Sequence, residues 1–415
     1  MDINHLTCYD FLKYRINNRH DVAIEYKDRK YTFSDLFDAI DCLAQKFINF
    51  NIEKGDICTL LLPESPELVV AFYAINKIGA IADVFASNIS LRSLKTCLKL
   101  SQSNVIITND EFYEKYKKDE HSLCERIIFL NGVFDTTLEK IKVKRTTQIH
   151  HRQKALLISN GIQSKTCLII PRDLKTCCEK QVVINNLALN SLVMNLNNTL
   201  NCSGKSYRVL SLLKASNMAG FVLNIHWSLC NGWNYIVVKK NSAEIKNNFL
   251  EKMSIDFLIS SSETLNDFFD LNYSPKLFSE KLKYILNVDD CCKQTNLNKN
   301  IVDAFAEKSF IQAFEIAEIC SVFAVFDSVD EPFIICKPIE NIKVIMKDIQ
   351  YNSKFHRSIG QISLYSDSLM CGYLSNNLME NNNLYRDSFG DVYLNTDLRG
   401  YIDPEQRLHV FPYLI

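Results

Sequence analysis

The stretch ICTLLLPESPELVVAFYAINKIGAIADVF, residues 57–85, decides the fold. It opens with a fully apolar run, as expected of a strand that is covered on both faces. Ser65 can then cap a helix that begins at Pro66, and Gly79 is predicted to stop that helix. A second buried strand follows. The stretch therefore predicts a β–α–β unit, the building block of a parallel sheet.

The same alternation continues on both sides of this unit. Upstream, apolar residues recur at helical spacing over residues 31–50, which predicts a helix capped by Ser34. Downstream, the pattern predicts, in order, a helix near 91–101, strands beginning at 104 and 127, a helix over 182–196, a strand at 208, a helix over 219–230, and strands beginning at 235, 255 and 283. Strands separated by helices indicate a mostly parallel sheet with helices on both faces.

The last part of the chain has a different character. From residue 333 the segments FIIC, IKVIM, GQISLY and DVYLN are short, β-rich and separated by Asn, Asp and Gly, which predicts a small barrel or an antiparallel sheet. The expected fold class is therefore α/β: two parallel-rich sheets flanked by helices, with a small β-rich, distorted-barrel subdomain. We expect three parts of one compact core, over residues 1–205, 206–332 and 333–415.

Composition excludes several classes of function. The 415 residues are 47% hydrophobic, enough for a large core, and 47 basic against 48 acidic side chains leave a net charge of −1. No global field would attract nucleic acid or an anionic membrane, and the basic run over 142–154 is interpreted as a solvated connection. The 15 cysteines are scattered without a C-x-x-C pair, which favours buried free thiols in a reducing cytoplasm. No apolar run approaches the ~20 residues of a membrane span.

A small polar loop lies between two apolar runs in LLISNGIQSKTCLIIPRDL, residues 156–174. Loops of this kind bind phosphate when unpaired N–H groups and a lysine converge on one anion. Here only Gly161 remains, and Ser159 and Ser164 stand where a Walker loop has glycines. On these residues alone an ordinary hairpin or turn is the favoured interpretation, and Lys165 would then be a surface lysine.

Several segments together resemble the large N-terminal domain of the adenylate-forming superfamily, which includes acyl-CoA synthetases, adenylation domains of peptide synthetases and luciferases. The segments are YTFSDL, IEKGD, LLPESPELVVAFYAINKIGA and RVLSLLKASNMAGFVLNIHWSLCNGW, and the resemblance extends from about residue 31 to about residue 410. INKIGA is closer to the acyl-CoA synthetases. The resemblance implies activation of a carboxylate by ATP and Mg²⁺ to an acyl-adenylate, followed by transfer to a thiol such as coenzyme A.

The resemblance also implies roles for individual residues. They are nucleotide binding by Gly161, Lys165, Phe314 and Asp397, Mg²⁺ binding by Glu318, and a substrate pocket at Asn217 and Gly220. The family's phosphate loop, S-G-T-T-G-K-P-K-G-V, is placed on residues 160–169. Asn217 could instead be no more than a helix cap. An extra residue before Asp403 leaves the register at Asp397 open by one position.

Departures from the family's pattern affect every one of these motifs. Most of the phosphate loop differs, Val288 and Asp289 replace a glycine pair beside the adenine, and Ala317 replaces a phosphate-binding hydroxyl. Asp289 and Asp290 would repel nucleotide phosphates. The sequence reads LHVFPYLI where the family has its hinge, so we expect the lid domain and its catalytic lysine to be absent, and no catalytic residue is assigned.

Two functions remain open. The favoured one is a degenerate adenylate-forming core, a pseudoenzyme with weak or no stand-alone ATP-dependent carboxylate activation, that binds a ligand or a partner chain. The alternative is an active acyl- or aminoacyl-adenylating ligase whose C-terminal lid is supplied in trans. ATP and Mg²⁺ are the expected cofactors only if the protein is active, and otherwise none is expected. The expected partners are a small carboxylate and a separate lid domain or carrier protein, with no nucleic acid and no membrane.

Overall fold

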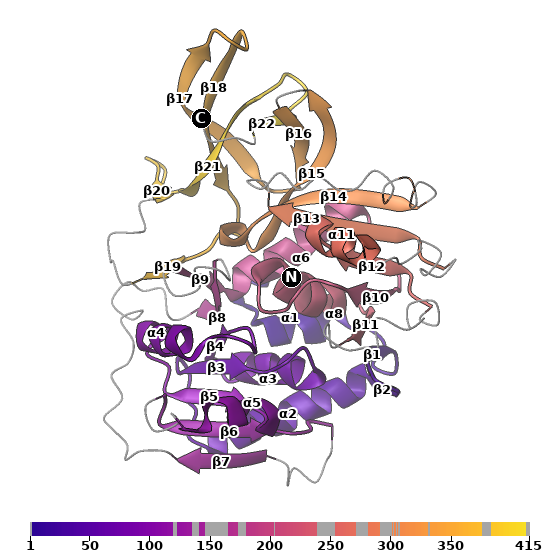
Figure 1. Cartoon of the computed structure of the whole chain (residues 1–415), viewed down its shortest axis with the longest axis vertical. Coiled ribbons are helices and arrows are strands. Elements are labelled where there is room, and N and C mark those ends of the chain that lie inside the picture. Colours follow the sequence, from indigo (N-terminus) through magenta and orange to yellow (C-terminus); the bar gives the residue numbers. More distant parts are fainter. Residues whose placement is uncertain are drawn as a thin grey trace.

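The fold was analysed in a computed structural model of the chain (Figure 1). The structure describes residues 2–118, 123–134, 141–145, 165–172, 180–202, 204–238, 254–270, 281–290, 301, 303, 305, 308–330, 333–375 and 383–411. Two sheets dominate it. The central strands of one are drawn in purple in the lower half of Figure 1, and most of the other runs from pink to yellow above it.

The first sheet has eight strands and is parallel at its centre. In spatial order the strands are β19 (Gly372–Ser375), β9 (Lys180–Asn185), β8 (Thr166–Pro171), β4 (Ile81–Val84), β3 (Ile57–Leu61), β5 (Val105–Thr108), β6 (Arg126–Leu130) and β7 (Ile141–Arg145). The pairs from β8 to β6 are parallel, while β19–β9, β9–β8 and β6–β7 are antiparallel. Strands β3 and β4 are buried along their whole length, as expected of strands covered on both faces.

The second sheet has 14 strands and changes from parallel to antiparallel at β14. In spatial order they are β17 (Lys343–Asn352), β18 (Arg357–Tyr365), β21 (Val392–Ile402), β22 (Leu408–Phe411), β16 (Phe333–Pro338), β15 (Ser321–Asp330), β14 (Ser309–Ile316), β13 (Tyr284–Asp290), β12 (Phe257–Ser260), β10 (Arg208–Ser211), β11 (Asn234–Val237), β1 (Val22–Tyr26) and β2 (Arg29–Thr32), with β20 (Leu384–Arg386) paired to β21. The β-rich tail predicted from residue 333 thus extends this sheet with antiparallel strands, except for β19, which joins the first sheet.

Helices cover the faces of both sheets. They are η1 (Ile3–His5), α1 (Cys8–Arg15), α2 (Phe33–Asn49), α3 (Pro66–Lys77), α4 (Leu91–Ser101), α5 (Asp110–Tyr116), α6 (Asn186–Leu200), α7 (Met218–Phe221), the π-helix η5 (Val222–Trp227), α8 (Ser228–Cys230), α11 (Ser262–Asp270) and the 3-10 helix η7 (Ala317–Ile319). Helices α3 and α6 contact the first sheet, α8 contacts the second, and α1 touches all three. One apolar core therefore runs from sheet to sheet through these helices.

The predicted α/β class with two parallel-rich sheets is confirmed, whereas three local predictions are wrong. Residues 142–145 of the basic run lie in strand β7, paired with β6, and not in a connection. Residues 182–185 belong to strand β9, and helix α6 begins only at Asn186. Val182, Val183 and Ile184 are β-branched, which favours a strand, but their run of apolar residues merges with the helical pattern that follows. Helix α2 is capped by Thr32 and not by Ser34. The domain boundaries at 205 and 332 stay a prediction.

No helix among the described residues is long and apolar enough to cross a bilayer.

Candidate functional site

Two of the predicted site residues, Glu318 and Asp397, lie on either side of one arginine that the sequence did not single out. Arg172 Nε is 2.6 Å from Glu318 Oε1, and Arg172 Nη2 is 3.6 Å from Asp397 Oδ2. The hydroxyl of Tyr373 donates a hydrogen bond to the same Oε1 of Glu318. We call the four residues Arg172, Glu318, Tyr373 and Asp397 the arginine clasp.

The clasp is assembled from both sheets. Arg172 follows β8 and Tyr373 lies in β19, both in the first sheet, whereas Asp397 lies in β21 of the second sheet. Glu318 lies in η7, directly after β14 of the second sheet. The clasp therefore closes the junction between the two sheets.

Local hydrogen bonds hold each of these positions. The backbone N–H of Arg172 donates to Lys180 O at 3.1 Å, which closes the ladder of the β8–β9 hairpin. The carbonyl of Glu318 accepts from the N–H of Met370 at 2.8 Å. Beside Asp397, the hydroxyl of Thr396 donates to Ile362 O at 2.7 Å. These contacts fix the backbone, so the side chains meet in one defined arrangement.

The turn after Glu318 has an unusual backbone. Cys320 adopts φ 66° and Ser321 adopts φ 143°, although side chains disfavour positive φ. Both residues are fully buried. Such conformations persist only where surrounding structure enforces them, and they gather at functional sites. The turn here ends η7 one residue after Glu318 and leads into strand β15.

The groups of the clasp differ in exposure and in ionisation. The Glu318 side chain is 4% exposed, that of Arg172 39% and that of Asp397 58%. Burial disfavours the charged guanidinium, but Glu318, and after it Tyr373 and Asp397, hold the pKa of Arg172 above its usual value. Burial, together with the charge and hydrogen bond of Glu318, raises the pKa of Tyr373 well above its usual range. The phenol is thus a neutral donor, and Arg172 is a permanent cation.

A second cation lies beside the clasp. Lys180 Nζ is 5.4 Å from the ring centroid of Tyr373, in a cation–π arrangement. Lys180 opens β9, so Arg172 and Lys180 are the two ends of the β8–β9 connection. The two acids of the clasp are therefore matched by two basic side chains. Among the residues that the structure describes, no group of three or more His, Cys, Asp or Glu could hold a metal ion.

Of the predicted phosphate loop, residues 160–169, the structure describes residues 165–169. Gly161 is outside the described residues. Lys165 is exposed at the start of β8, whereas Arg172 follows the end of that strand, and an extended strand of six residues spans about 20 Å. The structure therefore does not bring Lys165 to Glu318 and Asp397. The connection that starts beside these acids is the one between β8 and β9.

Phe314 and Asp289 lie in the neighbouring strands β14 and β13, and both contact residues outside the arginine clasp. Phe314 is 7% exposed and packs edge-on against Phe326, with ring centroids 6.4 Å apart. Asp289 is 5% exposed and accepts hydrogen bonds from the backbone and hydroxyl of Ser262 and from Gln312 Nε2, at 2.9, 2.5 and 2.8 Å. Val288 is buried in the core. The carboxylate of Asp289 is thus held by internal donors at the ends of β12, β13 and β14.

Asn217 and Gly220 build a helix start. Asn217 Oδ1 accepts from the N–H of Gly220 at 3.0 Å, so Asn217 caps α7, which confirms the cap interpretation. A Cβ on Gly220 would lie 2.0 Å from the carbonyl oxygen of Lys214. Close backbone approach therefore requires glycine here, and the substrate-pocket role of both residues stays a prediction.

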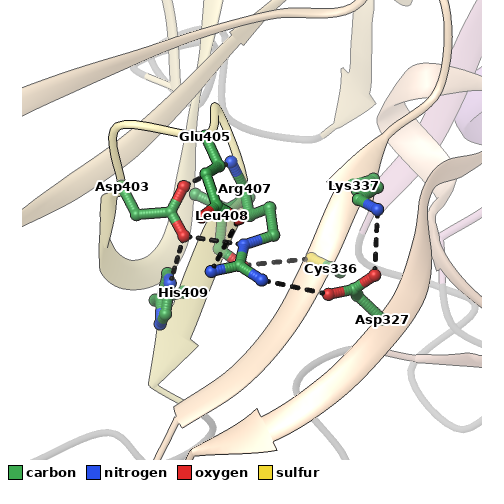
Figure 2. Close-up of polar contacts among 8 residues, drawn as sticks. All are labelled: Asp327, Cys336, Lys337, Asp403, Glu405, Arg407, Leu408 and His409. Carbon is green, nitrogen blue, oxygen red and sulfur yellow. Dashed lines mark hydrogen bonds and ion pairs between the residues drawn. The ribbon is translucent and has the colours of Figure 1, made fainter.

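A second charged cluster braces the strand that carries Asp397 (Figure 2). Asp403 and Arg407 flank the β21–β22 turn, with Arg407 Nε 2.8 Å from Asp403 Oδ2. Arg407 also reaches Asp327 of β15 at 3.6 Å, and His409 Nε2 lies 3.0 Å from Asp403 Oδ2. Burial opposes the charged form, but the hydrogen bonds from His409 and Arg407 hold the pKa of Asp403 well below its usual value. The cluster joins β15, β21 and β22.

Sequence reasoning missed Arg172, Lys180 and Tyr373. Arg172 carried a weak signal, because it is a charged residue directly after an apolar strand at the edge of a polar segment. Tyr373 carried none, since it enters the site through the pairing of β19 with β9. Their partners are far away in the chain, and only the tertiary fold brings them together.

Comparison with known proteins relates the first part of the chain to one enzyme family. The profile of the AMP-binding enzyme family matches residues 15–165. Acetyl-coenzyme A synthetase of Pyrobaculum arsenaticum is 37% identical over 113 residues, which are 27% of this chain and 16% of that enzyme. The Bacillus subtilis enzyme of the same name is 29% identical over 119 residues, 28% of this chain and 21% of that enzyme. The sequence match thus covers only a small part of the length of these relatives.

Solved structures extend the likeness of fold to nearly the whole chain. A long-chain-fatty-acid-CoA ligase of Archaeoglobus fulgidus superposes with a TM-score of 0.77 at 16% identity, over 99% of this chain and 84% of that one. The N-terminal domain of FACL13 from Mycobacterium tuberculosis superposes with a TM-score of 0.75 at 16% identity. The match covers 98% of this chain and 99% of that domain. The o-succinylbenzoate coenzyme A synthetase of Bacillus subtilis, solved with ATP and a magnesium ion, superposes with a TM-score of 0.72 at 18% identity. The match covers 96% of this chain and 78% of that one.

Residues 15–165 of this chain thus match the AMP-binding enzyme family, and nearly its whole length has the fold of coenzyme A ligase N-terminal domains.

Proposed function

We propose that this chain is a degenerate adenylate-forming core, with weak or no stand-alone ATP-dependent activation of a carboxylate, which serves instead to bind a ligand or a partner chain. One observation carries the proposal. The carboxylate of Glu318, at the position that the family resemblance gives to Mg²⁺, is 4% exposed and holds Arg172 and Tyr373 on one oxygen. A hydrated Mg²⁺ needs several oxygen ligands in near-octahedral geometry, and a guanidinium on the same carboxylate repels it.

Other features support the proposal. Asp397, to which the resemblance gives ribose binding, pairs with the same arginine. Asp289 stands where the family has a glycine, and its carboxylate accepts hydrogen bonds from Ser262 and Gln312. Catalysis of acyl-adenylate formation depends on preorganised charge at the triphosphate, and each missing contact typically costs about 2.7–4 kcal/mol of transition-state stabilisation. Several such contacts are altered together here.

The alternative function is an active ligase that receives its lid domain from another polypeptide. The observation in its favour is that the fold matches a coenzyme A ligase N-terminal domain solved on its own, over 98% of this chain and 99% of that one. Arg172 and Asp397 are also partly exposed, so a nucleotide could compete for them. A small carboxylate, ATP and Mg²⁺ would then be the substrate and cofactors, with a carrier protein or coenzyme A as acceptor.

Nucleotide binding and pyrophosphate exchange test the proposal. We expect calorimetric titration of the full chain with ATP and Mg²⁺ to give no saturable binding, and exchange to be undetectable with fatty, aromatic and amino acids. A coenzyme A ligase of the same family, assayed in parallel, is the positive control.

Two results would overturn this expectation. One is a micromolar Kd for ATP that Glu318→Ala or Asp397→Ala abolishes. The other is exchange that appears when the separately expressed lid of a related ligase is added, which would establish the alternative function.

A further inference from the structure

We infer that Arg172 is an internal counter-ion that closes the Glu318–Asp397 pair to divalent cations, so that its guanidinium occupies the place of a metal ion. The inference rests on the proposed function and extends it, because it names the group that shuts the site. Such an arrangement is an autoinhibitory contact built into the fold.

The first step of the argument is the burial of Glu318. A carboxylate that is 4% exposed needs a counter-charge and hydrogen-bond donors, since an unpaired buried charge is strongly unfavourable. Tyr373 supplies a hydrogen bond but no positive charge, because a phenol is not a cation in either protonation state. Among the described residues, the ion pair of Glu318 is with Arg172 at 2.6 Å. The charge of Glu318 is thus neutralised by this guanidinium.

The second step is the charge balance of the junction. Arg172 also approaches Asp397 at 3.6 Å, and Lys180 lies over the ring of Tyr373. Among the described residues of the junction, two acids and two bases leave no excess negative charge, and a divalent cation added to this set would make their sum positive. These described charges therefore disfavour a metal ion while both bases are in place.

The third step explains why the guanidinium prevails over a free ion. Arg172 is attached to β8, and its backbone N–H is bonded to Lys180 O at 3.1 Å. A tethered cation acts at a high effective concentration, whereas a free metal ion must pay for association and for partial dehydration. Removing the guanidinium would leave two carboxylates and a phenol oxygen, the oxygen ligands that Mg²⁺ and Mn²⁺ accept. Asp397 is exposed enough for an ion to enter from solvent.

Manganese binding to the full-length protein tests the inference. Free Mn²⁺ is titrated by electron paramagnetic resonance against wild type, Arg172→Ala and the double variant Arg172→Ala/Glu318→Gln. We expect wild type to bind Mn²⁺ at best weakly, Arg172→Ala to gain at least about tenfold in affinity, and the double variant to lose that gain, because the site then lacks its buried charge. Low, non-denaturing concentrations of guanidinium chloride should compete with Mn²⁺ in Arg172→Ala, since the two cations would share one place.

Arg208→Ala is the matched control. Arg208 Nη2 is 2.7 Å from Glu25 Oε2, and its side chain is 31% exposed, similar to the 39% of Arg172. Glu25 also accepts a hydrogen bond from Asn234 and lies 3.7 Å from Lys30 Nζ, so it keeps a basic partner when Arg208 is removed. We expect no new Mn²⁺ site in this variant. If Arg172→Ala is insoluble, Arg172→Met keeps the aliphatic bulk and removes only the charge.

The inference fails if a folded Arg172 variant binds Mn²⁺ no better than wild type, or if the gain survives Glu318→Gln. It also fails if wild type already binds as tightly as the variant. These outcomes are separate from the test of the proposed function. Pyrophosphate exchange by wild type would overturn the proposed function, whereas an inactive wild type with an Arg172 variant that gains no Mn²⁺ would overturn this inference alone.

Discussion

His226 is a buried histidine whose two hydrogen-bond partners show which ring nitrogen carries the proton in the neutral form. The residue is fully buried in the π-helix η5, with Nε2 3.0 Å from Asn190 Oδ1 and Nδ1 3.1 Å from the hydroxyl of Tyr73. Asn190 Nδ2 donates to Leu6 O, so its Oδ1 is the acceptor. His226 therefore donates from Nε2–H and accepts at Nδ1 from Tyr73. Burial lowers the pKa of His226 to about 3.

This histidine predicts a loss of stability in acid. Its pKa is 6.5 when unfolded and about 3 when folded, so its contribution is complete above pH 6.5 and is lost as the pH falls towards 3. The free energy of unfolding should fall by about 2 kcal/mol from this group between pH 7.5 and pH 5.0, and by about 5 kcal/mol when the loss is complete. Urea unfolding at the two pH values measures the effect.

The control for this prediction uses two variants. His226→Gln should be less stable than wild type at pH 7.5 but should lose less stability between the two pH values. His5→Gln should keep the wild-type pH dependence, because the His5 side chain is 78% exposed. An unchanged pH dependence in His226→Gln would mean that another group titrates.

Asp83 is a buried acid with the opposite pH dependence. It is fully buried in β4 and accepts from Gln181 Nε2 at 3.0 Å, and burial raises the pKa of Asp83 from 3.8 to about 7. Its favourable contribution is present below pH 3.8 and is lost as the pH rises to about 7. At pH 8 the ionised group should therefore cost about 4 kcal/mol.

We expect Asp83→Asn to raise the free energy of unfolding at pH 8, by up to about 4 kcal/mol, and to change it by less than about 1 kcal/mol at pH 4. Denaturant unfolding at both pH values checks this. Asp38→Asn, at an exposed position of α2, should leave stability unchanged within about 0.5 kcal/mol. A variant that is equally destabilised at both pH values would show that the amide does not fit the site.

At the scale of elements, the start of helix α2 shows where sequence reasoning chose the wrong cap. Thr32 Oγ1 accepts from the N–H of Asp35 at 3.1 Å, and Asp35 Oδ2 accepts from the N–H of Thr32 at 2.8 Å. This is a reciprocal capping box. Ser34 already lies inside the helix. Threonine and serine can both act as a helix cap. Strand β2 ends at Thr32, so Thr32 has the extended backbone of a cap residue and the helix begins at the next residue.

The two residues give a direct test of the cap. Thr32→Ala should lower the free energy of unfolding by about 1 kcal/mol, because it removes the acceptor for Asp35 N–H. Ser34→Ala should be neutral or slightly stabilising, since alanine is the better helix former. Urea unfolding of both variants at neutral pH decides the matter, and a larger loss in Ser34→Ala would reverse the assignment.

The β8–β9 hairpin is the element that shapes the candidate site. Its strands β8 and β9 pair antiparallel, with Pro171 opposite Gln181, so Arg172 and Lys180 emerge together. Tyr373 joins them because β19 pairs with β9, with Tyr373 opposite Val182. The sequence predicted the second apolar run but took the start of β9 for a helix. The pairing of β8 with β9, and with it the position of Arg172 beside Glu318, was therefore missed.

At the scale of the whole molecule, the two sheets are joined by segments that cross between them. Strand β19 returns from the tail to the first sheet, while β1 and β2, early in the chain, pair into the second sheet beside β11. Figure 1 shows β19 beside β9, far below the β17–β18 hairpin that precedes it in the chain. The arginine clasp lies at this crossing. A change in the packing of one sheet on the other would thus alter the contacts of Glu318.

The sequence by itself determined the α/β class, the β3–α3–β4 unit and the resemblance to the adenylate-forming superfamily, because these depend on patterns within a few dozen residues. Pro66 starts helix α3 and Gly79 stops it through their own backbone conformations, and the apolar runs on either side mark buried strands. These signals act between residues close together in the chain, so the sequence alone shows them. It also brought out Glu318 and Asp397 through the resemblance. Only the tertiary structure decided that Arg172 joins them. An ion pair depends on distance in space, and no periodicity or spacing in the sequence encodes which charges meet across two sheets.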